Sequence, residues 1–318
     1  MTIIGIAVAD ERDRTVGDVL ERRVERLREA SPELPLDQAR AAIARDHWFA
    51  DWEAALAAAD AVVDRDFEAA ADAIPAGDVT TLRELLRARP ELTRMRSPFA
   101  HRAMLVHHVA ANGIEAARQW RSPPNATQVL RALLDHRAQP DALCETYGGG
   151  SAQTPLCLLV SSVHPAEAGV QAALVEELCR AGARPDGLDD DGLPLWTAIM
   201  FGYTAAVDAL ARAGARVDDV IFAAALGDVA ALEASFGASG TLTATRRPQL
   251  DPRHTLEYAV IYAAAHGRRD AVALLLDHSP DLSVTEPVFG GTALGAARYQ
   301  GHAETVALLL SRGGGGPR

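Results

Sequence analysis

Aromatic residues are scarce in this sequence, where Phe, Trp and Tyr together fill 5% of the 318 positions. Sheet proteins draw on β-branched and aromatic side chains for their pleated surfaces, so this scarcity argues against a β-rich fold. Hydrophobic residues still make up 48% of the chain and charged residues 23%, a mixture too apolar for a disordered protein. Ala and Leu dominate, and small side chains of this kind favour closely packed helices.

Cysteines and long apolar runs are also few. The three cysteines, Cys144, Cys157 and Cys179, lack metal-ligand spacing, which argues against a disulfide scaffold or a structural zinc site and favours a reducing cytoplasm. The apolar run at residues 2–9 has no basic residue before it and is shorter than a signal peptide or a membrane span. We therefore expect a cytoplasmic protein that does not enter a membrane.

Basic residues are outnumbered by acidic ones, 31 against 43, which gives a formal net charge of −12. Such a field repels a phosphate backbone at long range, so we expect no nucleic-acid partner. We attribute the net negative charge to the need for solubility; the alternative is that it attracts a basic protein partner.

Two segments near the C-terminus repeat one pattern of small and aliphatic residues. Residues 291–301 read Gly-Thr-Ala-Leu-Gly-Ala-Ala-Arg-Tyr-Gln-Gly and lead into an Ala- and Leu-rich stretch at 302–310. Residues 258–277 carry the same arrangement, and the matching glycines Gly267 and Gly301 are 34 positions apart. A fixed period of this length is typical of stacked helix pairs.

These segments resemble ankyrin repeats, whose usual pattern is Gly-x-Thr-Pro-Leu-His-x-Ala-Ala-x-x-Gly before a leucine-rich second helix. In that pattern Thr caps the first helix, Pro fits its first turn, and Gly permits the left-handed turn before the second helix. Less regular copies occur at residues 67–86, 104–134, 154–183, 192–215 and 220–236. We predict an all-α fold, an ankyrin-repeat solenoid of about seven helix pairs with an N-terminal helical cap.

The region before the repeats resembles the segment that precedes the array in a family of bacterial ankyrin-repeat proteins. Residues 44–52, Ala-Arg-Asp-His-Trp-Phe-Ala-Asp-Trp, carry this resemblance. A capping role is expected because the first repeat of a solenoid has an apolar face that must be covered. The predicted domains are a helical capping region at 1–65, the repeat array at 66–312 and a flexible tail at 313–318.

Two enlarged turns interrupt the middle repeats. After Gly113 the second helix is delayed as far as Asn125, and four polar residues would share one stripe if the first helix continued through that glycine: His108, Asn112, Glu115 and Gln119. The next repeat has its own enlarged turn with Ser162, His164 and Glu167. Stacked repeats would set these turns side by side and close a pocket. The alternative is that the polar groups only fix the inserted loops.

A glycine-rich finger and three aromatic residues complete the candidate binding positions. Tyr147 precedes Gly148-Gly149-Gly150, whose backbone could approach a ligand, but no Walker lysine follows. Trp196, Phe201 and Tyr299 fall at or near positions that face the concave groove of an ankyrin array, where exposed aromatics suit partner recognition. The alternative is that they fill space beside small neighbours.

Catalytic and metal-binding patterns are weak. His107 occupies the structural histidine position of the repeat, and no His-x3-His or His-Glu-x-x-His spacing indicates a metal. We therefore predict no metal and no cofactor. The candidate acid–base residues are His164, Glu115 and His108, and the candidate ligand-binding residues are Asn112, Gln119, Tyr147, Ser162, Trp196, Phe201 and Tyr299.

The leading hypothesis is an ankyrin-repeat binding protein that holds a protein or a small molecule in its concave groove. The alternative is a small-molecule enzyme or ligand sensor whose pocket is formed by the enlarged turns of the second and third repeats.

Overall fold

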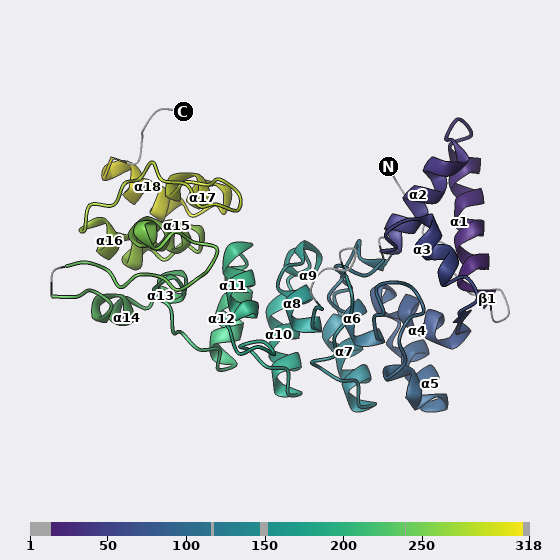
Figure 1. Cartoon of the computed structure of the whole chain (residues 1–318). Coiled ribbons are helices and arrows are strands. Elements are labelled where there is room, and N and C mark those ends of the chain that lie inside the picture. Colours follow the sequence, from purple (N-terminus) through teal and green to yellow (C-terminus); the bar gives the residue numbers. More distant parts are fainter. Residues whose placement is uncertain (1–13, 116–117, 147–151, 239, 314–318) are drawn as a thin grey trace. The chain divides into compact units, whose positions relative to one another are not determined.

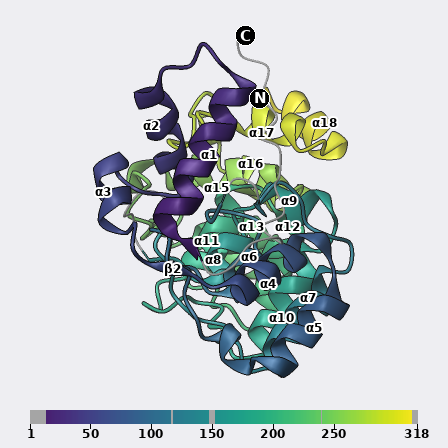
Figure 2. The same cartoon turned by 90° about the vertical axis from the view of Figure 1, so that its right-hand side faces the viewer.

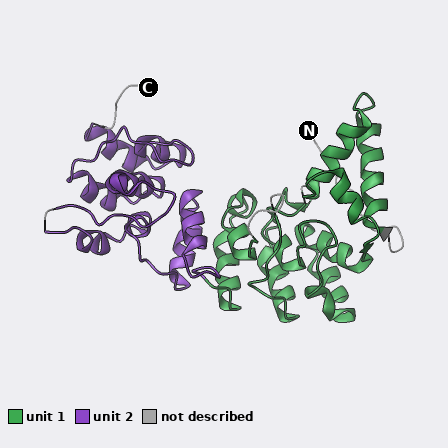
Figure 3. Cartoon of the chain, viewed as in Figure 1, with its two compact units in different colours: residues 1–184 green, residues 185–318 purple. Residues whose placement is uncertain are grey.

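A computed structural model describes residues 14–115, 118–146, 152–238 and 240–313 (Figure 1). Within these ranges the regular secondary structure is helical apart from two strands of two residues each and two isolated bridges, so the predicted all-α class is confirmed. The chain divides into two compact units, Met1–Arg184 and Pro185–Arg318 (Figure 3). The predicted boundary at residue 65 lies inside the first unit and stays a prediction.

The first unit begins with a short antiparallel pair of strands and three helices. These elements are β1 (Arg14–Thr15), α1 (Val16–Ala30), α2 (Leu36–Asp46), α3 (Trp52–Ala57) and β2 (Val62–Val63). The long helix α1 packs against α2 and α3 (Figures 1 and 2). Val16, Leu20 and Val24 on one face of α1 are buried in the core that these helices share.

Three helix pairs follow in the same unit and stack side by side. They comprise α4 (Arg65–Ala76), α5 (Val79–Ala88), η1 (Pro90–Thr93), α6 (Leu105–His108), α7 (Ala126–Asp135), α8 (Pro155–Leu159), α9 (Val163–Glu167) and α10 (Gln171–Arg180). The inner helices α4, α6 and α8 are successive neighbours, as are the outer helices α5, α7 and α10 (Figure 1).

The second unit contains four helix pairs. They comprise α11 (Leu193–Met200), α12 (Thr204–Arg212), α13 (Val220–Leu226), α14 (Val229–Ala234), η3 (Pro252–His254), α15 (Thr255–Ala265), α16 (Arg269–Leu276), α17 (Ala293–Tyr299) and α18 (Ala303–Ser311). Helices α13, α15 and α17 stack in sequence, and α14, α16 and α18 stack behind them. Helix α15 is buried on nearly all sides, because its alanines allow neighbours to approach closely.

Local sequence signals explain where these helices begin and end. Helix α4 ends at Gly77, whose φ of 70° is left-handed, and the side chain of Asp78 then accepts a hydrogen bond from the Thr81 amide to begin α5. Gly227 and Asp228 repeat this device between α13 and α14. A glycine followed by a capping residue therefore reverses the chain within each of these pairs.

The pair α11–α12 departs from a regular stack. Gly202 and Gly227 are 25 positions apart, against 34 for Gly267 and Gly301, so the connection from α12 to α13 is shortened. The end of α11 reaches past α13: the ring of His266, at the end of α15, lies 3.0 Å from the carbonyl oxygen of Ile199. The first pair of this unit therefore lies against the inner surface of the pairs that follow it.

Candidate functional site

The polar stripe required α6 to continue through Gly113, and it does not form because the helix ends earlier. Helix α6 ends at His108, and the backbone turns into the left-handed region at Ala111 (φ 49°) and Gly113 (φ 69°). A helix cannot continue through two such residues so close together. The four predicted residues consequently have different surroundings.

Glu115 lies in a buried ion cluster centred on Arg118. The guanidinium of Arg118 lies 3.1 Å from the carboxylate of Glu115, 2.7 Å from that of Glu68 and 2.7 Å from that of Asp72. Arg118, Glu115 and Glu68 are all buried, whereas Asp72 is half-exposed. The planar fork of arginine suits this task because it can donate to several carboxylates at once.

Charge pairing decides the protonation state of Glu115. Burial alone would raise its pKa, but Arg118 and a hydrogen bond from His101 hold the pKa well below its usual range. Burial raises the pKa of Glu68, because Arg118 only partly offsets the loss of water. The pKa of Arg118 is raised well above its usual value by Glu115 and Glu68 in spite of burial. Glu115 is thus a fixed anion inside the protein, which does not suit the acid–base role considered for it.

The ion cluster continues toward α1 and α2 through two histidines. His101 accepts a hydrogen bond at Nδ1 from the Ala103 amide, 3.1 Å away, so its Nε2–H donates to Glu115 over 3.2 Å. On the other side, Arg23 of α1 donates to Nε2 of His47 and lies 4.0 Å from Glu115. We name this set the junction cluster; its members are Arg23, His47, Glu68, His101, Glu115 and Arg118.

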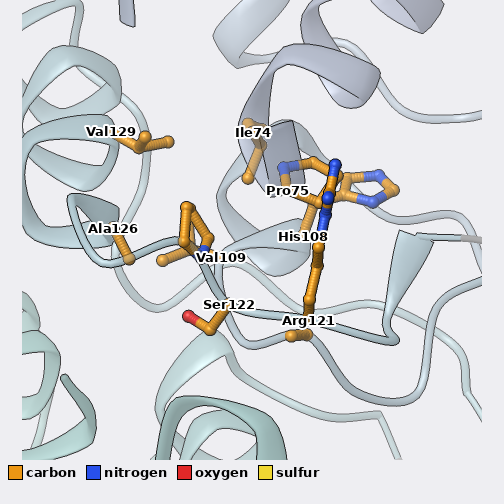
Figure 4. A pocket seen from close by; sticks show the side chains of 10 residues that line it. Ile74, Pro75, His108, Val109, Arg121, Ser122, Ala126 and Val129 are labelled. Atoms are coloured by element: carbon orange, nitrogen blue, oxygen red, sulfur yellow. The ribbon is translucent and has the colours of Figure 1, made fainter. Parts of the chain in front are cut away.

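His108 adjoins the junction cluster and is also buried. Neither of its ring nitrogens has a hydrogen-bond partner among the described residues. Burial, followed by the charge of Arg118, lowers its pKa well below the usual value, so the ring is neutral. His108 lines a hollow together with Ile74, Arg121 and Ser122 (Figure 4), but this hollow has no room for a water molecule. It cannot hold a substrate in this conformation.

The two enlarged turns lie side by side, as the stacking of repeats predicts. The Asn112 side-chain amide donates to the hydroxyl of Ser161 (2.8 Å) and to the carbonyl of Leu158 (3.3 Å). The hydroxyl of Ser162 donates to the carbonyl of Ala111 over 3.1 Å. These bonds join the two turns to each other, which is the structural alternative to a ligand pocket.

The remaining residues of the predicted pocket do not converge on a common space. Gln119 accepts a hydrogen bond from the Ile114 amide, 3.2 Å away, and so fixes its own loop. His164 is half-buried and Glu167 is exposed. Tyr147 lies outside the described residues. No observation on these side chains supports the enzyme alternative.

Trp196 was expected on an exposed surface, and this expectation is wrong. Its side chain is 3% exposed and meets the ring of Tyr262 edge to face, with centroids 5.4 Å apart. The reason is the position of α11: this helix lies against α15 and covers the side of α15 that would otherwise be open. His266 strengthens this packing through hydrogen bonds to Thr204 (2.8 Å) and Ile199 (3.0 Å).

Phe201 is exposed, as expected, and belongs to a group of aromatic side chains. Its ring stacks on Tyr203 at 6.1 Å and meets Phe289 at 5.8 Å. Phe201 is 37% exposed and Phe289 64%, while Tyr299 at the end of α17 is 89% exposed. We name Phe201, Tyr203, Phe289 and Tyr299 the aromatic surface: the first three rings contact one another, and Tyr299 precedes Gln300, whose side chain lies over Gly202.

The turn that presents Phe289 is held firmly. The buried carboxylate of Glu286 accepts hydrogen bonds from the amides of Val288 (2.7 Å), Phe289 (2.8 Å) and Gly291 (3.0 Å). A carboxylate with three amide donors fixes a loop more strongly than neutral hydrogen bonds do. The backbone that carries Phe289 is therefore fixed without a partner.

Sequence reasoning missed Phe289 and Trp120. Phe289 sits between Val288 and a pair of glycines, a context that marks a turn but not an exposed aromatic. Trp120, 61% exposed, belongs to the enlarged turn after α6, where its neighbours are mostly polar. A tryptophan beside Pro123-Pro124 in a polar loop was the available signal.

Metal-ligand groups and membrane-spanning helices are both absent from the described residues. In these ranges no group of three or more His, Cys, Asp or Glu is placed to hold a metal ion. Likewise, none of the helices in the described part of the chain is long and apolar enough to cross a bilayer.

Comparisons with known proteins point to one repeat type. Residues 260–310 match the family model described as ankyrin repeats (many copies). Over 57 residues the chain is 42% identical to inversin of Danio rerio; the match covers 18% of this chain and 6% of inversin. The crystal structure of the human ASB11 ankyrin repeat domain aligns with 78% of this chain and 98% of its own, at 17% identity and a TM-score of 0.42.

The matched residues comprise most of α15, all of α16 and α17 and most of α18, which are the two most regular helix pairs. The predicted fold class is confirmed: the chain is an all-α protein built from helix pairs, and its segment 260–310 consists of ankyrin repeats.

Proposed function

We propose that this chain is a protein-binding module whose recognition surface is the aromatic surface of the second unit. The observation that carries the proposal is the exposure of Phe289 and Tyr299 on elements that are already fixed, a turn held by Glu286 and the helix α17. Pre-positioned aromatic side chains are the usual anchors of protein interfaces. Burying each ring in a partner contributes on the order of 2 kcal/mol.

The position of α11 limits the surface to which such a partner could bind. In an ankyrin repeat the two residues before the helix-ending glycine face the groove, and these are Tyr299 and Gln300 in α17. The Gln300 side chain already covers Gly202, where a β-carbon would approach it to 2.0 Å. The partner would therefore engage Tyr299 and the Phe289 turn beside α11, and the inner face beneath α11 is taken by the chain itself.

The experiment is quantitative co-purification with the full chain as bait. We expect Phe289→Ala and Tyr299→Ala to reduce recovery of the bound protein about tenfold or more, the size of a binding hot spot. The matched control is Trp120→Ala, which removes an exposed aromatic ring from the first unit and should leave recovery unchanged. Circular dichroism checks that all three variants are folded.

Equal recovery with all three variants would refute the aromatic surface as the binding site. Reduced recovery of the bound protein with Trp120→Ala alone would indicate that the partner binds at the enlarged turn after α6.

A further inference from the structure

The N-terminal helices meet the repeats through loops and the junction cluster. Residues 14–63 have their own apolar core, into which Phe99 projects from the loop before α6. The ring of His47 stacks on Phe99 with centroids 4.5 Å apart, and the indole of the adjacent Trp48 donates to the carbonyl of Ile114. We call residues 14–63 the cap.

His47 is held at this boundary in its neutral form. Arg23 is always a cation and donates to Nε2, so the single ring proton of His47 must lie on Nδ1. That Nδ1 is buried without a hydrogen-bond partner among the described residues. The Nδ1–H donor of the ring thus has no acceptor among the described residues, and its Nε2 acceptor is already bound to the Arg23 cation.

The charges around His47 oppose a second proton. It faces Arg23 from α1, Glu115 and Arg118 from the turn after α6, and His101 from the loop before α6. Two cations therefore stand against one anion, and that anion is already engaged by Arg118. Burial first, and then Arg23, lowers the pKa of His47 well below 6.5.

We propose that the junction cluster is a proton-operated latch: a proton taken up by His47 places a second cation beside Arg23 inside the buried boundary, so the cap separates from the repeats and, without Phe99 in its core, opens while the repeats stay folded. Once the cap is free, water solvates both cations. Glu115 keeps its partners Arg118 and His101, because all three belong to the repeat side of the boundary.

The expected response follows from linkage. In the released state His47 titrates near 6.5, whereas in the closed state it stays neutral to lower pH. Each pH unit below 6.5 consequently favours release by about tenfold, until the closed-state pKa is reached. Between pH 7.5 and pH 5.0 the ratio of released to closed cap rises by up to about 30-fold, the limit reached when His47 stays neutral in the closed state.

Hydrogen–deuterium exchange of the full chain at pH 7.5 and 5.0, corrected for intrinsic exchange rates, tests the latch. We expect amides of α1 and α2 to lose up to about 30-fold in protection at pH 5.0, while those of α4 and α5 keep theirs. His47→Gln retains an acceptor for Arg23 but takes up no proton, so protection of α1 and α2 should be equal at both pH values. The matched control, His254→Gln in the exposed η3 of the second unit, should respond like the wild type.

Joint loss of protection in α1, α2, α4 and α5 would overturn the proposal, as would an undiminished response in His47→Gln. If His47→Gln destabilises the cap at pH 7.5, the same exchange measurement on Arg23→Gln provides the test. Without the facing cation, a proton on His47 should no longer open the boundary, and the response should shrink. A response in Arg23→Gln as large as that of the wild type would overturn the latch.

Discussion

Replacing Arg118 by Gln isolates the contribution of the buried ion cluster. The side chain of Arg118 is 5% exposed and lies between the carboxylates of Glu68 and Glu115, each 2% exposed. Glutamine fits the space but removes the positive charge. Two buried carboxylates would then face each other with only His101 and the distant Arg23 as counterweights.

The expected loss is about 4 kcal/mol in the free energy of unfolding, because breaking a buried ion pair leaves an uncompensated charge and costs about 3–5 kcal/mol. The third carboxylate, Asp72, adds little, since it is 37% exposed and water screens it. A loss of this size is a large part of the roughly 5–15 kcal/mol that stabilises a typical domain.

Urea denaturation followed by circular dichroism measures this loss, with Arg131→Gln as the matched control. Arg131 also pairs with a glutamate, Glu177, but its own side chain is 57% exposed, so its removal should leave stability unchanged. Equal stability of the Arg118 and Arg131 variants would refute the assignment of a buried cluster.

The pH dependence gives a second check on Arg118→Gln. A carboxyl whose folded pKa is raised stabilises the folded state below its unfolded pKa, and that stability is lost as pH rises through the folded value. The pKa of Glu68 is raised already and should rise further without Arg118. The difference between wild type and variant should therefore narrow from pH 7 to pH 5; a constant difference would contradict the argument.

Three further outcomes concern the second unit, each measured by urea denaturation. Trp196→Ala should cost about 3–5 kcal/mol because it opens a cavity, whereas Tyr299→Ala, at an exposed position, should stay within about 0.5 kcal/mol; equal costs would contradict the burial of the indole. Gly267→Ala should cost about 1 kcal/mol more than Gly301→Ala: both have positive φ, but a β-carbon at the first would approach an imidazole of the next pair to 2.6 Å and at the second would meet nothing within 4 Å. The pKa of His266 is lowered to about 4 by burial, so its stabilisation is present above pH 6.5 and about 3 kcal/mol of it is lost by pH 4; His266→Gln should flatten that part of the profile, and an unchanged slope would refute it.

Much of the fold could be predicted because ankyrin-type signals are local. Thr292 caps α17 by accepting a hydrogen bond from the Gly295 amide, and Gly267 and Gly301 adopt the left-handed conformation that ends the first helix of each pair. Each signal acts within a few residues of the chain, so its meaning does not depend on what lies across the fold.

The candidate site was predicted less well, because its geometry depends on contacts between distant residues. The stripe from His108 to Gln119 assumed a continuous helix, yet α6 ends at His108 and the chain then turns at Ala111, a residue with no sequence signal for a left-handed conformation. Glu115 looked available for chemistry until the structure placed Arg118 and Glu68 against it, the latter 47 positions earlier in the sequence.

By itself, the sequence determined the helix pairs, their period and the presence of two enlarged turns. The tertiary structure decided which polar residues became buried partners and which aromatic residues stayed exposed. Trp196 and Tyr299 illustrate the division: both looked like groove residues, but α11 lies against α15 and buries the first, while nothing among the described residues covers the second. Burial is set by packing between elements, and periodicity along one helix does not specify which neighbour that helix will meet.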